Sequence, residues 1–246
     1  ADAVLSCGNT GALMAGGTIK LRTMRGIERP ALGTVIPGKT KNFIFIDVGA
    51  SPDPKPESLV DNAILGANYA RIALGVKNPR VGLLSNGTED GKGNMLVQTA
   101  HRLFKAQEGV INYGGLLEGF NLFDGHFDVV VCDGFTGNVI LKLTEGVAKM
   151  LLGMLKQMFL ANLGGKLAYL LLKGSVADLK HQMDSEEYGG APFLGAKQPV
   201  IKAHGSSKAK GIKNAIRQAK ICVENDLCGT MQSALDELAA ANKPEE

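Results

Sequence analysis

One unit recurs along the whole chain: a short apolar run, a loop rich in Gly, Asn, Ser and Thr, and then a segment with the apolar periodicity of a helix. Five apolar runs open such units, at residues 3–7, 43–46, 80–84, 128–132 and 200–203. Strands that alternate with helices predict an α/β fold with an open, doubly wound sheet. Ligands bind such sheets at the carboxyl ends of the strands, so we expect the loops to converge there.

Each of these loops is suited to binding an anion. A loop that leaves a strand and opens a helix carries backbone N–H groups that have no partner inside the helix. Those groups, together with the helix dipole, favour a negative charge at the start of the helix. Glycine in the loop lets a ligand approach the backbone closely. The repeated unit therefore predicts a binding site for an anionic group.

Length and composition are those of one globular domain. The 246 residues suit a single α/β domain, which we place at residues 1–240 with a tail at 241–246. Helices are expected near residues 12–24, 57–75 and 94–107, and a mostly polar connector at 174–199. The formal net charge is only +3, with no arginine-rich arm or basic–aromatic stripe, which argues against a nucleic-acid partner.

The spacing of the cysteines and the absence of several common catalytic motifs argue against several classes of site. The four cysteines form no CxxC pair and no metal-ligand spacing with histidine, so a reducing cytoplasm fits and no metal is expected. Asp47, Asp53 and Asp133 could in principle bind Mg²⁺, but their spacing matches no metal motif. Cys7 could be a nucleophile, although a buried thiol at a strand end is the favoured interpretation. The chain lacks a GxxxxGK[ST] loop, a GxGxxG fingerprint and a GxSxG elbow.

Residues 147–173 carry more apolar side chains than one core contact requires. One stripe at helical spacing consists of Val147, Met150, Leu151, Met154, Leu155 and Met158. Leu160 and Leu163 lie outside it, Gly164-Gly165 is expected to break the helix, and apolar positions resume at Leu167. The uninterrupted apolar runs are far shorter than the ~20 residues of a membrane span. We therefore predict a projecting apolar helical hairpin that contacts an acyl chain or a membrane surface through Leu160, Leu163 and Leu167.

The loops supply the candidate site residues. Side-chain donors, helix-start glycines and strand-end carboxylates form the candidate binding set: Asn9, Thr10, Gly11, Asp47, Asn94, Asp133, Thr136, Gly137, Ser206 and Ser207. The candidate catalytic residues are Lys92, Asn138 and His204. Structural alternatives stay open for each loop, namely a capped helix start at 8–11 and at 204–207, a surface turn at 89–94 and a purely structural turn at 133–138.

The same loops carry a family resemblance that runs from residue 1 to about 220. Its motifs are Gly8-Asn-Thr-Gly-Ala-Leu-Met14, Arg29-Pro-Ala31, Asp47-Val-Gly-Ala50, Asn78-Pro-Arg-Val-Gly-Leu-Leu84, Glu89-Asp-Gly-Lys-Gly-Asn94, Val131-Cys-Asp-Gly-Phe-Thr-Gly-Asn-Val139, Tyr188-Gly-Gly-Ala-Pro192 and His204-Gly-Ser-Ser207. In this order they resemble the bacterial phosphate acyltransferases of phospholipid synthesis. That family begins with a further glycine-rich strand and helices, so we expect an N-terminal segment to be absent from this chain.

The resemblance implies a fold, a reaction and partners. It implies an isocitrate/isopropylmalate-dehydrogenase-like α/β fold, a homodimer, and a cytoplasmic enzyme attached peripherally to the membrane. The implied reaction joins the acyl group of an acyl carrier protein thioester to inorganic phosphate, with no nucleotide or metal cofactor. The acyl phosphate product then feeds a membrane glycerol-3-phosphate acyltransferase.

This reaction assigns roles to the candidate residues. Three loops are expected to cradle phosphate, through Asn9, Thr10 and Gly11, through Thr136, Gly137 and Asn138, and through Ser206 and Ser207. Lys92 would neutralise the phosphate or the oxyanion, and His204 would donate a proton or orient the substrate. The alternatives are a phosphate acetyltransferase-like enzyme that uses coenzyme A, a nicotinamide-dependent decarboxylating dehydrogenase, and a non-enzymatic anion- or lipid-binding module.

Overall fold

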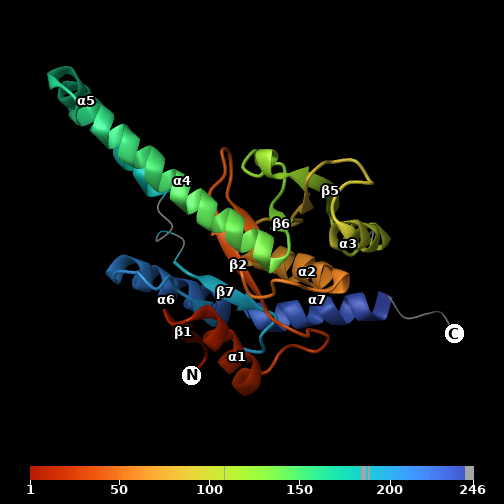
Figure 1. Cartoon of the computed structure of the whole chain (residues 1–246). Helices are drawn as coiled ribbons and strands as arrows, with labels where there is room; N and C mark the ends of the chain where they lie inside the picture. Colours follow the sequence, from red (N-terminus) through yellow and green to blue (C-terminus); the bar gives the residue numbers. More distant parts are fainter. Residues whose placement is uncertain (108, 184–186, 188, 242–246) are drawn as a thin grey trace.

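A single mixed β-sheet forms the centre of the molecule in the computed structural model, which describes residues 1–107, 109–183, 187 and 189–241 (Figure 1). In the sheet the strands follow the order β1-β8-β7-β2-β3-β6-β4-β5. Their bounds are β1 Val4–Ser6, β2 Ala31–Ile36, β3 Phe43–Ile46, β4 Val81–Ser85, β5 Tyr113–Glu118, β6 Val129–Val131, β7 Ala191–Leu194 and β8 Val200–Lys202.

Helices cover both faces of this sheet. They are α1 Thr10–Leu21, α2 Pro56–Ala73, α3 Met95–Ala106, α4 Gly134–Leu160, α5 Leu163–Gln182, α6 Ala209–Glu224 and α7 Leu227–Ala241. Strand β3 shows why both faces of the sheet are covered. All four of its residues are buried, and successive side chains of a strand point to opposite faces. Ile44 and Ile46 join the core beneath α2, α3, α6 and α7, whereas Phe43 and Phe45 join the core on the other face, beside α1 and the start of α4.

The predicted elements mostly exist, with some omissions. Each of the five apolar runs contains a strand, and the helices predicted near 12–24, 57–75 and 94–107 correspond to α1, α2 and α3. Strands β2, β5 and β7 and helix α7 were not predicted. The connector expected at 174–199 instead holds the end of α5 and strand β7. Residues 242–246 of the expected tail, and Tyr188 of the resemblance motifs, lie outside the described residues.

Strand directions correct one expectation about the sheet. The α/β class is confirmed, and β3, β6, β4 and β5 run parallel to one another. However, β2 pairs antiparallel with both β3 and β7, and β7 pairs antiparallel with β8, so β1 and β8 run opposite to β3. The carboxyl ends of the strands therefore lie at two opposite edges of the sheet, and the loops do not converge in a single row. The likeness to isocitrate and isopropylmalate dehydrogenases stays a prediction.

Helices α4 and α5 occupy the region predicted to be an apolar hairpin and extend beyond it. Figure 1 shows them reaching away from the sheet at the upper left. The chain turns at residues 161–162, because Asn162 caps α5 by accepting the Gly165 N–H at 2.8 Å. Gly164-Gly165, expected to break the helix, instead lies inside the first turn of α5. None of the helices in the described ranges combines the length and hydropathy that crossing a bilayer requires.

Asp47 organises the turn that follows β3. Its side chain is 1% exposed, and its two carboxylate oxygens accept four backbone N–H groups. Oδ1 accepts from Leu32, Gly49 and Ala50 at 2.9–3.1 Å, and Oδ2 accepts from Ser51 at 2.7 Å. Burial raises the pKa of Asp47, and the four donors act in the opposite direction. The carboxylate expected to bind phosphate is thus fully engaged in holding β2 and the β3 turn together.

Asp47→Asn is expected to destabilise the protein by about 3 kcal/mol, because an amide NH₂ replaces one acceptor and leaves a buried backbone donor unsatisfied. A change of that size lowers the Tm by roughly 10 °C in a domain of this length. Thermal unfolding followed by circular dichroism measures it. The exposed neighbour Asp53, changed to Asn, is the matched control. Equal melting temperatures for the two variants would contradict this role.

Candidate active site

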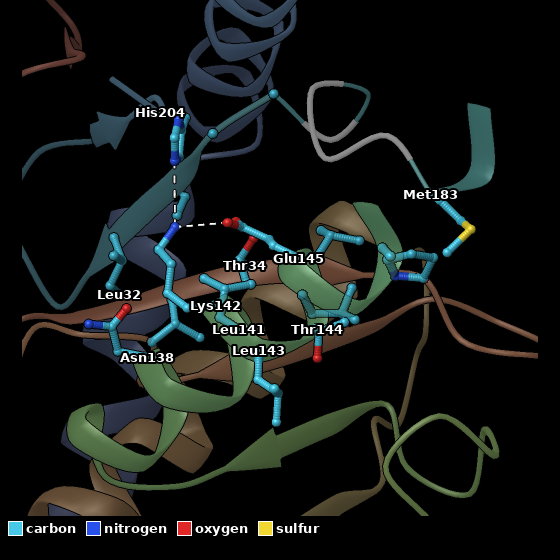
Figure 2. A pocket seen from close by; sticks show the side chains of 18 of the residues that line it. Leu32, Thr34, Asn138, Leu141, Lys142, Leu143, Thr144, Glu145, Met183 and His204 are labelled. Carbon is cyan, nitrogen blue, oxygen red and sulfur yellow. Dashed lines mark hydrogen bonds and ion pairs between the residues drawn. The ribbon is translucent and has the colours of Figure 1, made fainter. Parts of the chain in front are cut away.

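A cavity of about 810 Å³ lies where α4 passes over the end of β2 and the loop that follows β8 (Figure 2). Segments far apart in the sequence form its walls: the start of α1, residues 34–39, residues 138–151 of α4, and residues 202–207. The strand directions explain this meeting. Helix α4 starts at the edge where β6 ends and crosses the sheet toward the opposite edge, where β1 and β8 end.

Lys142 and His204 mark the polar end of the cavity. Lys142 Nζ lies 2.9 Å from Glu145 Oε2 and 3.5 Å from His204 Nε2, as the dashed lines of Figure 2 show. On the other side of the ring, Nδ1 lies 2.7 Å from Ser206 Oγ and accepts the Ser206 N–H at 3.2 Å. The Nε2 atom therefore faces the cavity beside Lys142, and Nδ1 faces Ser206.

A second lysine stands beside the first. Lys202, at the end of β8, also lines the cavity, and its Nζ donates to the Ala203 carbonyl at 2.5 Å. Burial lowers the pKa of Lys202, and the positive charge of Lys142 adds to that effect. Two cations near one cavity wall repel each other, so an anion placed between them relieves this repulsion. The polar end of the cavity is therefore suited to a small anion such as phosphate.

Residues of all three predicted cradle loops reach this cavity. Thr10, Asn138 and Ser207 line it directly, and Ser206 holds the His204 ring. Asn9 caps α1 by accepting the Ala12 N–H at 3.1 Å, and Gly11 follows in the exposed first turn. Residues 8–11 therefore form a capped helix start, and Thr10 in the same segment also lines the cavity.

The start of α4 is built from the predicted loop at 133–138. Asp133 caps the helix by accepting the Thr136 N–H at 2.8 Å. Gly137 packs against the Asp47 carbonyl and Cys132 Sγ so closely that a Cβ atom would not fit. Asp133 and Gly137 therefore fix the position of α4. Asn138 is the residue of this loop that lines the cavity.

Lys92 and Asn94 lie away from this cavity. Both are exposed and follow β4, whose carboxyl end lies at the edge opposite to the ends of β1 and β8. Asn94 caps α3 by accepting the Val97 N–H at 2.9 Å. Asp90 secures the same loop through His101 Nε2 at 3.1 Å and Lys105 Nζ at 2.8 Å. The strand directions thus separate Lys92 from His204, and Lys92 is not among the residues that line the cavity with Asn138.

Lys142, Glu145 and Lys202 were not predicted as site residues. Lys142 follows Asn138 by four residues, so the two share one face of α4, and that spacing was a usable signal. Lys202 ends an apolar strand and gave no comparable signal. Cys7 is half-buried and is not among the residues that line the cavity. Within the described ranges no three His, Cys, Asp or Glu side chains gather in a way that could hold a metal ion.

Comparison with known proteins places the chain in a family. The family model described as "Fatty acid synthesis protein" matches residues 1–230. A protein of Lysinibacillus sphaericus (strain C3-41) named "Phosphate acyltransferase" is 50% identical over 232 residues, which are 94% of this chain and 70% of that protein. A protein of the same name from Clostridium acetobutylicum is 46% identical over 238 residues, covering 97% of this chain and 71% of that protein.

Solved structures show the same fold at low sequence identity. EutD phosphotransacetylase from Staphylococcus aureus matches with a TM-score of 0.53 and 18% identity, covering 95% of this chain and 63% of that chain. A branched-chain phosphotransacylase from Enterococcus faecalis V583 matches with a TM-score of 0.56 and 16% identity, covering 91% and 74%. This chain therefore spans less than two thirds of the S. aureus protein, and the likeness is one of fold.

Proposed function

The chain belongs to the fatty acid synthesis protein family, and from that premise we propose that it is a phosphate acyltransferase that moves a fatty acyl group from acyl carrier protein to inorganic phosphate. The observation that carries this proposal is the cavity, in which two lysines and a histidine at one end adjoin apolar walls. A small anion and a long apolar chain are the two parts that an acyl phosphate combines. No metal or nucleotide is needed to supply this chemistry.

In the proposed reaction a phosphate oxygen attacks the carbonyl carbon of the thioester. Lys142 and Lys202 hold the phosphate, and Thr10, Asn138 and Ser207 supply further donors to it or to the carbonyl oxygen. As the oxygen attacks, His204 Nε2 takes the proton of the phosphate hydroxyl. The C–S bond then breaks and the ring gives that proton to the thiolate, so the products are an acyl phosphate and a free thiol. Ser206 keeps Nε2 directed into the cavity through its contacts with Nδ1.

This mechanism moves the cationic role from Lys92 to Lys142 and Lys202. The reason is that Lys142 and Lys202 line the cavity and Lys92, on the loop after β4, does not. The site is supported indirectly by Asp47, Asp133 and Gly137. They fix the turn after β3 and the start of α4, the helix that carries Asn138 and Lys142. Asn94 acts as a helix cap.

The apolar surface of α4 and α5 supports a peripheral membrane contact. Leu160, Leu163 and Leu167 surround the turn between these helices and are 58%, 84% and 60% exposed. Lysines at 149, 156, 166 and 173 accompany them, as in helices that lie on anionic membrane surfaces. The apolar hairpin thus attaches a cytoplasmic enzyme to the membrane, where a glycerol-3-phosphate acyltransferase receives the product. The remaining exposed apolar side chains of α4 support a homodimer.

Lys142→Ala is expected to raise the KM for phosphate about tenfold to a hundredfold, because a charged donor contributes roughly 1.5–3 kcal/mol. The measurement is the release of carrier-protein thiol from acyl-acyl carrier protein across a phosphate titration in the full-length protein. Lys92→Ala is the matched control and should change the KM little. A larger effect of Lys92→Ala than of Lys142→Ala would restore the original assignment. Activity with acyl-coenzyme A alone would favour the phosphate acetyltransferase-like alternative.

Leu160→Glu and Leu163→Glu are each expected to weaken binding to anionic phospholipid vesicles by about tenfold, since burying one leucine contributes roughly 1.5–3 kcal/mol. Co-sedimentation with vesicles measures the binding. Ile216→Glu is the control, because Ile216 is 58% exposed on α6, away from the turn between α4 and α5. Unchanged vesicle binding with a reduced mass in light scattering would assign these leucines to the dimer contact instead.

A further inference from the structure

The cavity is longer than a phosphate site requires. Residues Asn138 to Leu151 of α4 line it, and thirteen steps of ~1.5 Å along a helix span ~20 Å. A volume of about 810 Å³ is that of a site for a whole drug-sized ligand, so one phosphate ion leaves most of it unfilled. The unfilled part must suit some other portion of the substrate.

The side chains change character along this length. Lys142, Glu145 and His204 gather at one end, and Figure 2 shows Met183 on the side of the pocket away from His204. Beyond Glu145 the helix contributes Val147, Ala148 and Leu151 to the lining. Val35 and Ile36 of β2 and Pro37 after it form an apolar wall of the same cavity. The structure thus offers a mainly apolar path along α4 and β2, although Thr34, Lys39, Thr144 and Gln182 also line the cavity.

We propose that this path holds the acyl chain and that Ala148 and Leu151 determine which chain lengths the enzyme accepts. The proposal rests on the proposed function and adds its specificity determinant. Ala148 follows Leu141 by seven residues and Glu145 by three, so it shares a helix face with these two lining residues and follows the reacting end along α4. Its methyl side chain leaves space that a larger residue would fill. Leu151 lies nearly one turn further on and marks the far end of the lining contributed by α4.

Discrimination by length follows from the burial of methylenes. Each CH₂ removed from water strengthens binding about fourfold, so the acceptable length is set by how many methylenes fit before a side chain blocks the path. A longer chain must then leave its end in water or displace the blocking residue, and both reduce its advantage. A large residue at position 148 therefore penalises long chains much more than short ones.

The test compares palmitoyl and octanoyl groups on the same carrier protein. We expect Ala148→Phe to lower the ratio of kcat/KM for palmitoyl over octanoyl donors by at least about tenfold, which is the loss of roughly two buried methylenes. Leu151→Ala should shift preference toward longer chains. Met150→Phe is the matched control, since Met150 neighbours both positions on α4 but does not line the cavity, and its ratio should equal that of the wild type. An unchanged ratio in a folded Ala148→Phe protein would overturn the proposal.

Direct binding separates this proposal from the proposed function. Displacement of a fluorescent fatty acid by palmitate or octanoate reports on the path without any turnover. Tighter binding of palmitate than of octanoate, with the difference lost in Ala148→Phe, supports the path even for a protein without phosphate-dependent thiol release. Equal palmitate binding by the wild type and Ala148→Phe contradicts it even for an active enzyme. A normal KM for phosphate in Ala148→Phe would show that the cationic end is intact.

Discussion

The position of the first turns of α4 is the constraint on which the site depends. Because β1 and β8 run opposite to β3 and β6, the loops that could contribute to one site end at two different edges of the sheet. Helix α4 joins the two groups by crossing from one edge to the other. Its start is fixed by the Asp133 cap and by Gly137, which packs directly on the Asp47 carbonyl. Asp47 is in turn held by four backbone N–H groups, so a buried carboxylate sets where Asn138 and Lys142 stand.

This arrangement separates residues that support the site from residues that face it. Asp47, Asp133 and Gly137 have their polar atoms or their space committed to the fold, whereas Asn138, Lys142 and His204 present theirs to the cavity. The electrostatics agree with that division. Lys142 forms an ion pair with Glu145, and burial disfavours the charged form of Lys202. The excess positive potential is thus directed at the space between them.

Much of the fold could be predicted from the sequence, and the site only partly. Apolar runs of four or five residues beside glycine-rich loops predicted five strands that the structure contains, and Asn94 predicted the start of α3. Strand β5 was missed because Gly114-Gly115 interrupts its apolar pattern, and β7 because it follows a polar stretch. Strand direction has no local signature, since it depends on which strands pair. That is why Lys92 and His204, on similar loops, were expected together and are found apart.

The same helix that positions the reacting groups also leads toward the exposed apolar turn. Lys142 and Glu145 lie early in α4, Ala148 and Leu151 follow on the cavity side, and Leu160 ends the helix. A helix of 27 residues is ~40 Å long, so it can hold a phosphate near one end and reach a membrane surface at the other. In the proposed function the acyl phosphate is a reactive, amphiphilic product. A path that is apolar along α4 keeps its chain out of water and leads toward the exposed leucines at the end of the helix.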